Sequence, residues 1–173
     1  MIKSLINFIA FQAAWFACVL GAARGWWWQA PLAALIAVSI HLAMSKRRSN
    51  EGALLCVAIA IGLVTDLFMI KVGCIALQQT SSLALAALWF ASLWAAFATT
   101  LNSSLSWMRG KPVLALVLGA IGGPLAYFGG QKLGAVTLPR EGFSILAIGI
   151  EWAIIMPLLT WMSERLLPKE VRP

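Results

Sequence analysis

Long apolar runs follow one another along the chain, separated by short polar stretches. Each run is close to the roughly 20 residues that an α-helix needs to cross about 30 Å of hydrocarbon. The runs cover residues 4–22, 27–44, 53–72, 82–100, 112–130 and 142–162. They lack the alternation of apolar and polar residues that a membrane β-barrel requires. Because backbone groups in lipid must be satisfied within the segment, the pattern predicts an all-α, polytopic membrane bundle of about six helices.

Composition extends this prediction to the whole chain. Of the 173 residues, 61% are hydrophobic and 11% are charged, and the mean hydropathy is +0.88. No hydrophilic stretch is long enough to bury a soluble core of its own. We therefore predict a single integral membrane domain over residues 1–173, in which short loops make consecutive helices antiparallel neighbours.

The net charge of +7 could indicate a nucleic-acid-binding protein, but its distribution argues against one. The dense basic run Lys46-Arg47-Arg48 lies between the second and third apolar runs, and basic loops stay on the cytoplasmic side of a membrane. With six spans, this places both termini in the cytoplasm. The expected partners are membrane lipids, some of them anionic, and no nucleic acid.

The first apolar run has a second interpretation. A lysine near the start, followed by an apolar run that ends in Gly21-Ala22-Ala23, resembles a cleavable signal peptide. Asn7 and Gln12 interrupt the run, and its length suits a complete crossing. These features favour a retained helix.

Two acids lie within apolar runs, Asp66 in the third and Glu151 in the sixth. A charged side chain at membrane depth is costly and usually faces a bundle interior or a wet cavity. At 1.5 Å per residue, both acids fall in the outer half or near the midplane, as does Tyr127, and Gln12 lies near the middle. We predict that these four residues line one ligand-binding cavity open to the outer side. The alternative is an interhelical hydrogen bond that only fixes packing.

Two prolines interrupt the last two runs. Pro124 follows Gly122 and Gly123 and lacks the backbone N–H that would donate to the carbonyl of Ala120. Pro157, six residues after Glu151, likewise lacks a backbone donor. We expect a kink or an unwound turn beside the proposed cavity, because broken helices at membrane depth are tolerated where they line one. The alternative is a bent helix without a ligand.

Small residues recur every four positions on the first run, at Ala13, Ala17 and Gly21. This spacing places them on one helical face, where another backbone can approach closely. The face could pack inside the bundle or dock a second membrane protein. A similar spacing on the fifth run is better explained by internal packing.

Motifs for catalysis are missing from the sequence. His41 is the only histidine, and Cys18, Cys56 and Cys74 have no metal-binding or redox spacing. Nucleophile elbows and phosphate-binding loops are also absent. We therefore assign no catalytic residue, no metal site and no cofactor, although the pair of acids could in principle do acid–base work.

Three stretches carry a resemblance to a known family. They are NFIAFQAAW at 7–15, FATTLNSSL at 97–105 and GAIGGPLAY at 119–127. In these stretches the chain resembles a family of small bacterial inner-membrane proteins designated only as a domain of unknown function. The resemblance implies no catalytic residue. It implies a lipid-linked role, because genes of that family often neighbour genes for fatty-acid-modifying methyltransferases.

A more distant likeness concerns architecture alone. The helix number, the Ala13–Ala17 spacing and the stretch GLVTD at 62–66 look like those of substrate-binding subunits of vitamin-uptake transporters and of a rod-shape membrane protein. Similar architecture does not carry function. The sequence thus leaves three hypotheses: binding or transport of a small or lipidic molecule, an accessory subunit for a membrane-lipid-modifying enzyme, and a small intramembrane enzyme.

Overall fold

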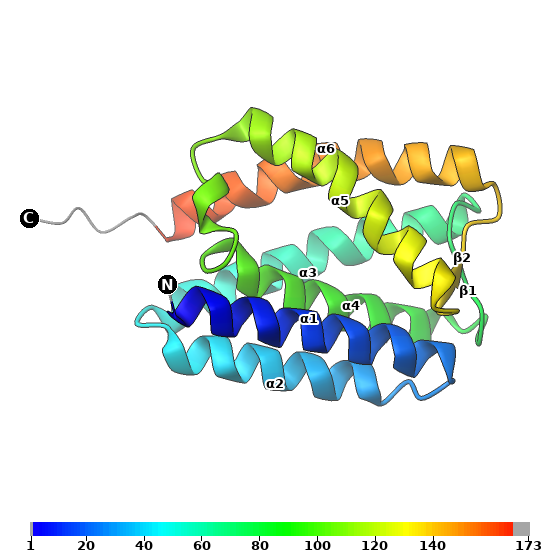
Figure 1. Cartoon of the computed structure of the whole chain (residues 1–173), viewed down its shortest axis with the longest axis horizontal. Helices are drawn as coiled ribbons and strands as arrows, with labels where there is room; N and C mark the ends of the chain where they lie inside the picture. Colours follow the sequence, from blue (N-terminus) through cyan, green and yellow to red (C-terminus); the bar gives the residue numbers. More distant parts are fainter. Residues whose placement is uncertain (1, 168–173) are drawn as a thin grey trace, which may run out of the picture.

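The computed structural model describes residues 2–167; residues 1 and 168–173 lie outside the described range. The described part of the chain is almost entirely helical, which confirms the predicted all-α bundle (Figure 1). Its helices are α1 (Ile2–Ala23), α2 (Gln29–Met44), α3 (Arg48–Lys71), α4 (Leu83–Leu101), the 3-10 helix η1 (Ser106–Met108), α5 (Pro112–Lys132) and α6 (Glu141–Leu166).

Five of these helices, all except α2 and η1, are long and apolar enough to cross a membrane. The α2 helix has 16 residues and is about 24 Å long. It nevertheless runs antiparallel to α1 and returns the chain to the end where α1 begins (Figure 1). A multi-pass membrane protein is therefore confirmed, whereas the inner-membrane location and the cytoplasmic termini stay predictions.

Most helices pack around α4, whereas α5 packs mainly against α6. The α4 helix contacts α1, α2 and α3, and α3 contacts α6. The α5 helix packs along α6 and crosses the bundle obliquely: it stands apart from α1 where it begins and approaches α1 where it ends (Figure 1). One side of the bundle consequently has α1 and α5 as its two edges, with α4 between them.

Two loops meet in a small sheet at the end of the bundle opposite the start of α1. Strand β1 (Ala76–Leu77) pairs antiparallel with β2 (Val136–Thr137). The turns that lead into them contain Gly73 and Gly134, whose φ angles of 72° and 85° suit glycine. The sequence showed no strand here because two residues are too short for a periodic signal. We call this the sheet end, and the opposite one the terminal end.

A buried polar contact joins α1 to the rest of the bundle. Asn7 is 1% exposed, and its amide nitrogen donates to the carbonyl of Thr99 at 3.1 Å. Its amide oxygen accepts from the hydroxyl of Ser104 at 2.8 Å. The polar residue that interrupts the first apolar run is therefore a packing contact of an integral helix.

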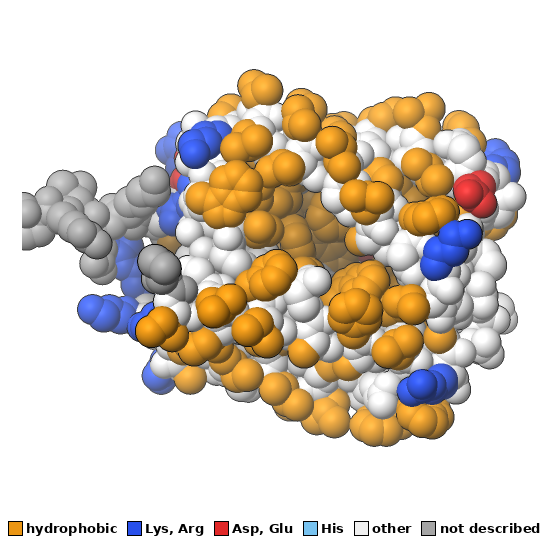
Figure 2. Space-filling model, in the orientation of Figure 1, with side chains coloured by type: hydrophobic (Ala, Val, Ile, Leu, Met, Phe, Trp, Pro, Cys, Tyr) orange, Lys and Arg blue, Asp and Glu red, His pale blue; other side chains and the backbone are white. Residues whose placement is uncertain are grey.

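The surface has the layout of a membrane protein. Hydrophobic side chains cover the middle of the visible face, and lysines and arginines gather towards its two ends (Figure 2). Several basic side chains lie over aromatic rings there, such as Arg24 over Trp26 at the sheet end and Arg165 over Trp161 at the terminal end. Basic and aromatic residues at both ends of an apolar belt are typical of the two membrane interfaces.

Candidate ligand-binding cavity

A cavity of about 580 Å³ lies between the α1–α4 side of the bundle and the α5–α6 pair. It is visible as a hollow in the centre of the molecule, framed by hydrophobic side chains (Figure 2). The helices run across this view, so the hollow opens on the flank of the bundle rather than at its sheet end. The sequence predicted an opening to the outer side; the separation of α5 from α1 near the start of α5 instead leaves an opening on the apolar flank of the bundle.

Glycines explain why α5 lies against α6. A Cβ atom at Gly119 or Gly123 would overlap Trp152 of α6, so these positions admit only glycine at this helix separation. Gly122, on another face of α5, lines the cavity and has no atom within 4 Å of an ideal Cβ position. The small residues of α5 thus serve internal packing, as the sequence indicated, and also leave space in the cavity.

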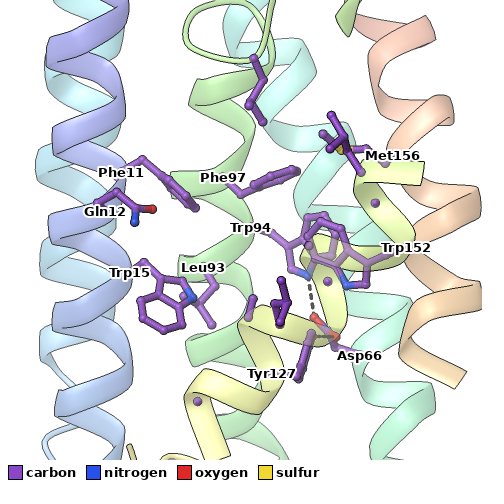
Figure 3. Close-up of a pocket in the computed structure, with 18 of the residues that line it drawn as sticks. Phe11, Gln12, Trp15, Asp66, Leu93, Trp94, Phe97, Tyr127, Trp152 and Met156 are labelled. Carbon is purple, nitrogen blue, oxygen red and sulfur yellow. Dashed lines mark hydrogen bonds between the residues drawn. The ribbon is translucent and has the colours of Figure 1, made fainter. Parts of the chain in front are cut away.

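Aromatic side chains make much of the cavity wall (Figure 3). The rings that line it belong to Phe11, Trp15, Trp89, Phe90, Trp94, Phe97, Trp107, Tyr127 and Trp152. Trp94 and Trp152 stack with ring centroids 4.9 Å apart, and Phe97 packs edge-on against both. This geometry is favourable for aromatic pairs and makes one wall of the cavity stiff.

Asp66 lies at the back of the cavity, fully buried beneath two of these aromatic residues. Its Oδ2 accepts a hydrogen bond from Nε1 of Trp94 at 2.6 Å, and its Oδ1 accepts one from the hydroxyl of Tyr127. Gly62, one turn earlier on α3, leaves the space that the Trp94 indole occupies. Asp66 therefore fixes two side chains of the wall that come from different helices.

Glu151 lies close to Asp66 but does not line the cavity. Its side chain is 7% exposed, and the two carboxyl groups are near enough to interact electrostatically. Neither carboxyl oxygen accepts a hydrogen bond within the described part of the chain. The hydroxyl of Thr65, which lies towards Glu151, donates to the carbonyl of Gly62 instead. Asp66 and Tyr127 thus meet at the cavity, whereas Glu151 lies outside its lining.

Gln12 is on the opposite wall, on α1 (Figure 3). Its half-buried side chain makes no hydrogen bond to the described residues. The indole nitrogen of Trp152 is likewise buried without a partner there. The cavity therefore combines apolar walls with the amide of Gln12, which is free to bond to a ligand.

The two prolines do not interrupt their helices. The α5 helix continues through Gly122, Gly123 and Pro124, and α6 continues through Pro157. The unwound turn that the sequence suggested is thus absent from both helices. The carbonyl of Ala120 is directed at Gly149 of α6, where an ideal Cβ would lie 3.3 Å away. Pro124 is part of the close contact between α5 and α6, next to Gly149.

The family described as "Protein of unknown function (DUF2878)" matches residues 4–158. The chain belongs to this family. The matched range includes every residue that lines the cavity. No curated protein and no solved structure matches the chain. The prediction of an uncharacterised family is thereby confirmed.

The three stretches that carry the resemblance to the DUF2878 family converge on the cavity. Residues 7–15 lie on α1, residues 97–105 lead from α4 towards η1, and residues 119–127 lie on α5. Each stretch contributes side chains or glycines to the lining. Segments far apart in the sequence thus form one site, which the sequence predicted through only three of its lining residues, Gln12, Asp66 and Tyr127.

A second polar cluster, at the terminal end, was missed by the sequence analysis. Nε2 of His41 lies 3.1 Å from Oε2 of Glu51, which also accepts a hydrogen bond from Asn102 at 3.1 Å. The hydroxyl of Ser163 donates to the amide oxygen of Asn102. The sequence marked His41 only as the single histidine of the chain. The sequence does carry a signal for this contact: His41 lies in the last turn of α2, and Glu51 lies in the first turn of α3, the next helix.

The small residues of α1 do not form one continuous free face. Gly21 is buried against Gln29, Ala17 is half-buried, and Ala13 is exposed. Part of the spacing therefore serves the contact between α1 and the turn that follows it. Docking of a second membrane protein at Ala13 stays a prediction.

Proposed function

We propose that this protein binds a small lipidic molecule in the flank cavity, which the molecule enters sideways from the bilayer. The observation that carries the proposal is the cavity itself, open on the apolar flank of the bundle. Its volume of about 580 Å³ lies within the range of roughly 300–1,000 Å³ that is typical of ligand sites.

The lining supports a lipidic ligand over a polar one. Nearly all of the wall is aromatic, aliphatic or glycine, so an apolar chain would be buried without loss of hydrogen bonds. The few polar groups, Gln12, Asp66 and Tyr127, are spread over three helices and could orient one polar group of the ligand. A few placed polar groups in an apolar wall are the usual pattern of a specific small-molecule site.

The membrane setting belongs to the same proposal. We place the terminal end in the cytoplasm, because the basic run Lys46–Arg48 lies there. Asp66 and Tyr127 are each five residues before the end of their helices at Lys71 and Lys132, so they would lie about 8 Å from the outer interface. The polar part of the ligand would then be held in the outer half of the bilayer.

A pair of matched glycine variants tests the cavity. Gly122→Leu should fill part of the space without displacing any neighbour, whereas Gly142→Leu adds the same side chain at an equally open position outside the cavity. Wild-type and variant proteins are extracted in a mild detergent, and the retained molecules are identified by mass spectrometry. We expect Gly122→Leu to lower retention of a specific lipid at least tenfold, roughly, and Gly142→Leu to leave it unchanged.

Other outcomes discriminate among the hypotheses. Equal retention by wild type and Gly122→Leu would contradict ligand binding in this cavity. Recovery of a stoichiometric protein partner with no retained lipid would favour an accessory subunit of a lipid-modifying enzyme.

A further inference from the structure

We infer that the ligand is a cationic amphiphile, one that carries a protonated amine or a quaternary ammonium group on an apolar chain. This inference rests on the proposed function and names the chemical class of its ligand. The first argument is the sign of the charge. Asp66 lines the cavity, and no lysine, arginine or histidine among residues 2–167 does. A carboxylate or phosphate head group would therefore meet no counter-charge in a medium where an unpaired ion is costly.

The second argument is the aromatic wall. Indole rings attract cations over their faces more strongly than the other aromatic side chains do, and the attraction grows when water is excluded. Trp15, Trp89, Trp94, Trp107 and Trp152 all line the cavity. Trp15 and the Trp94–Trp152 stack lie on opposite sides of the space in Figure 3. A cation between these walls would interact with several rings at once.

The third argument concerns how Asp66 is held. Its two oxygens each accept a hydrogen bond, one from an N–H group of Trp94 and one from the O–H group of Tyr127. Two donors directed at one carboxyl group fix its position, and a cation in the cavity would favour its charged form over its neutral form. Because Asp66 is 0% exposed, it acts as a positioning residue: it orients two wall side chains and places a carboxyl group beneath them. Charges interact strongly over such short distances in a medium of low dielectric constant.

Glu151 is a second acid near the cavity. Its carboxyl group is near enough to Asp66 for the two acids to interact electrostatically, and no basic side chain among the described residues pairs with it. A cation in the cavity would reduce the repulsion between the two acids, and an anion would increase it. The apolar chain of the ligand would leave through the open flank, past exposed Trp107 and Leu125.

The test compares three amphiphiles with one tail and different head groups. Each carries an 11,12-dibromododecyl chain that quenches tryptophan fluorescence, and the heads are trimethylammonium, hydroxyl and sulfonate. The full-length protein is placed in zwitterionic lipid nanodiscs, and quenching is measured against the mole fraction of amphiphile in the bilayer. Quenching that persists in Gly122→Leu is subtracted as contact outside the cavity.

We expect the trimethylammonium compound to saturate at a mole fraction at least tenfold lower than the sulfonate, roughly, with the alcohol between them. Asp66→Asn keeps the shape and one acceptor oxygen of the side chain. It should weaken binding of the cationic compound more than binding of the neutral compound. A purely structural role of Asp66 would weaken both equally. The wild-type ranking tests the inference even if Asp66→Asn does not fold.

The remaining outcomes separate this inference from the proposed function. If all three compounds bind equally and Gly122→Leu abolishes their binding, the cavity binds lipidic molecules but the inferred charge selectivity is wrong. Preferential binding of the sulfonate would likewise overturn the inference. If no compound shows quenching that depends on Gly122, both the inference and the proposed function fail.

Discussion

Two buried acids organise polar clusters in this protein, and their partners differ in kind. Glu51 at the terminal end bonds to His41 and Asn102, which are polar residues near helix ends. Asp66 in the bundle interior bonds to Trp94 and Tyr127, which are aromatic. The Glu51 cluster ties helix ends together next to the membrane interface. The Asp66 cluster holds the wall of a cavity.

The difference shows how a membrane bundle can couple stability to a binding site. The partners of Glu51 do not line the flank cavity, so changes there should affect folding alone. The partners of Asp66 each use their polar tip to bond to the acid and their ring to line the cavity. Changes at Asp66 should therefore affect folding and ligand binding together.

The largest effect is expected for Asp66→Leu. It removes the acceptor of two buried donors, on Trp94 and Tyr127, and each orphaned donor costs about 1–3 kcal/mol. We expect the free energy of unfolding, measured by SDS titration in mixed micelles, to fall by about 2–5 kcal/mol. Asp66→Asn keeps an acceptor and should lose less. An equal loss in both variants would show that the charge, rather than the hydrogen bonds, stabilises the cluster.

A glycine pair on α3 tests the packing of the same wall. A Cβ at Gly62 would overlap the indole of Trp94, so Gly62→Ala should displace the ring from Asp66 and destabilise the protein by about 1–3 kcal/mol. Gly52→Ala, where no atom lies within 4 Å, should be neutral or stabilise the helix by about 1 kcal/mol.

Near-ultraviolet circular dichroism gives an independent measurement for this pair. The stacked indoles of Trp94 and Trp152 should produce a coupled signal. We expect Gly62→Ala to lose that signal and Gly52→Ala to retain it. Retention in both variants would contradict the close contact between α3 and Trp94.

Changes in the Glu51 cluster should lower stability by a smaller amount and should not affect ligand binding. Glu51→Ala removes the acceptor of Asn102 and the carboxyl group beside His41, and we expect a loss of about 1–2 kcal/mol in SDS titration. Ligand retention per folded molecule should not change. Glu141→Ala, at an exposed first-turn acid of α6, is the matched control and should lose little. Reduced ligand retention in Glu51→Ala would mean that the two clusters are coupled.

Glu151 should give the smallest change, with the opposite sign. Neither oxygen of its carboxyl group is hydrogen-bonded to the described residues, so the acid loses the solvation of water without a replacement. Glu151→Met, which is similar in length, should leave stability unchanged or raise it by about 1 kcal/mol. If the negative field serves cation binding, the same variant should weaken the preference for the trimethylammonium compound. A clear loss of stability would indicate a hydrogen-bond partner for Glu151.

Helix positions were predictable because they depend on local sequence. The predicted run at 112–130 became Pro112–Lys132, and the run at 82–100 became Leu83–Leu101. The third helix begins five residues earlier than predicted, at Arg48, because polar residues at a membrane interface can continue a helix beyond its apolar part. In a bilayer every apolar run must satisfy its own backbone, so composition and length decide its structure.

The functional cavity was predictable only in part. The polarity of Gln12, Asp66 and Tyr127 marked them as unusual at membrane depth, which follows from the cost of burying polar groups. Tryptophans such as Trp94 and Trp152 gave no such signal, because an aromatic residue in an apolar helix is most simply a packing residue. Their role in the cavity wall depends on which helices are neighbours.

The sequence by itself thus determined the membrane class, the helical segments and the three polar residues of the cavity lining, because hydropathy and side-chain polarity act residue by residue. Only the tertiary structure decided that α5 packs on α6 and stands apart from α1 at the terminal end, that the cavity opens on the flank, and that Glu151 lies outside the cavity lining. These features follow from contacts between helices, such as Gly119 and Gly123 against Trp152, which form only when distant segments meet. Close packing of complementary surfaces depends on pairs of residues, and the order of helices in the chain does not specify those pairs.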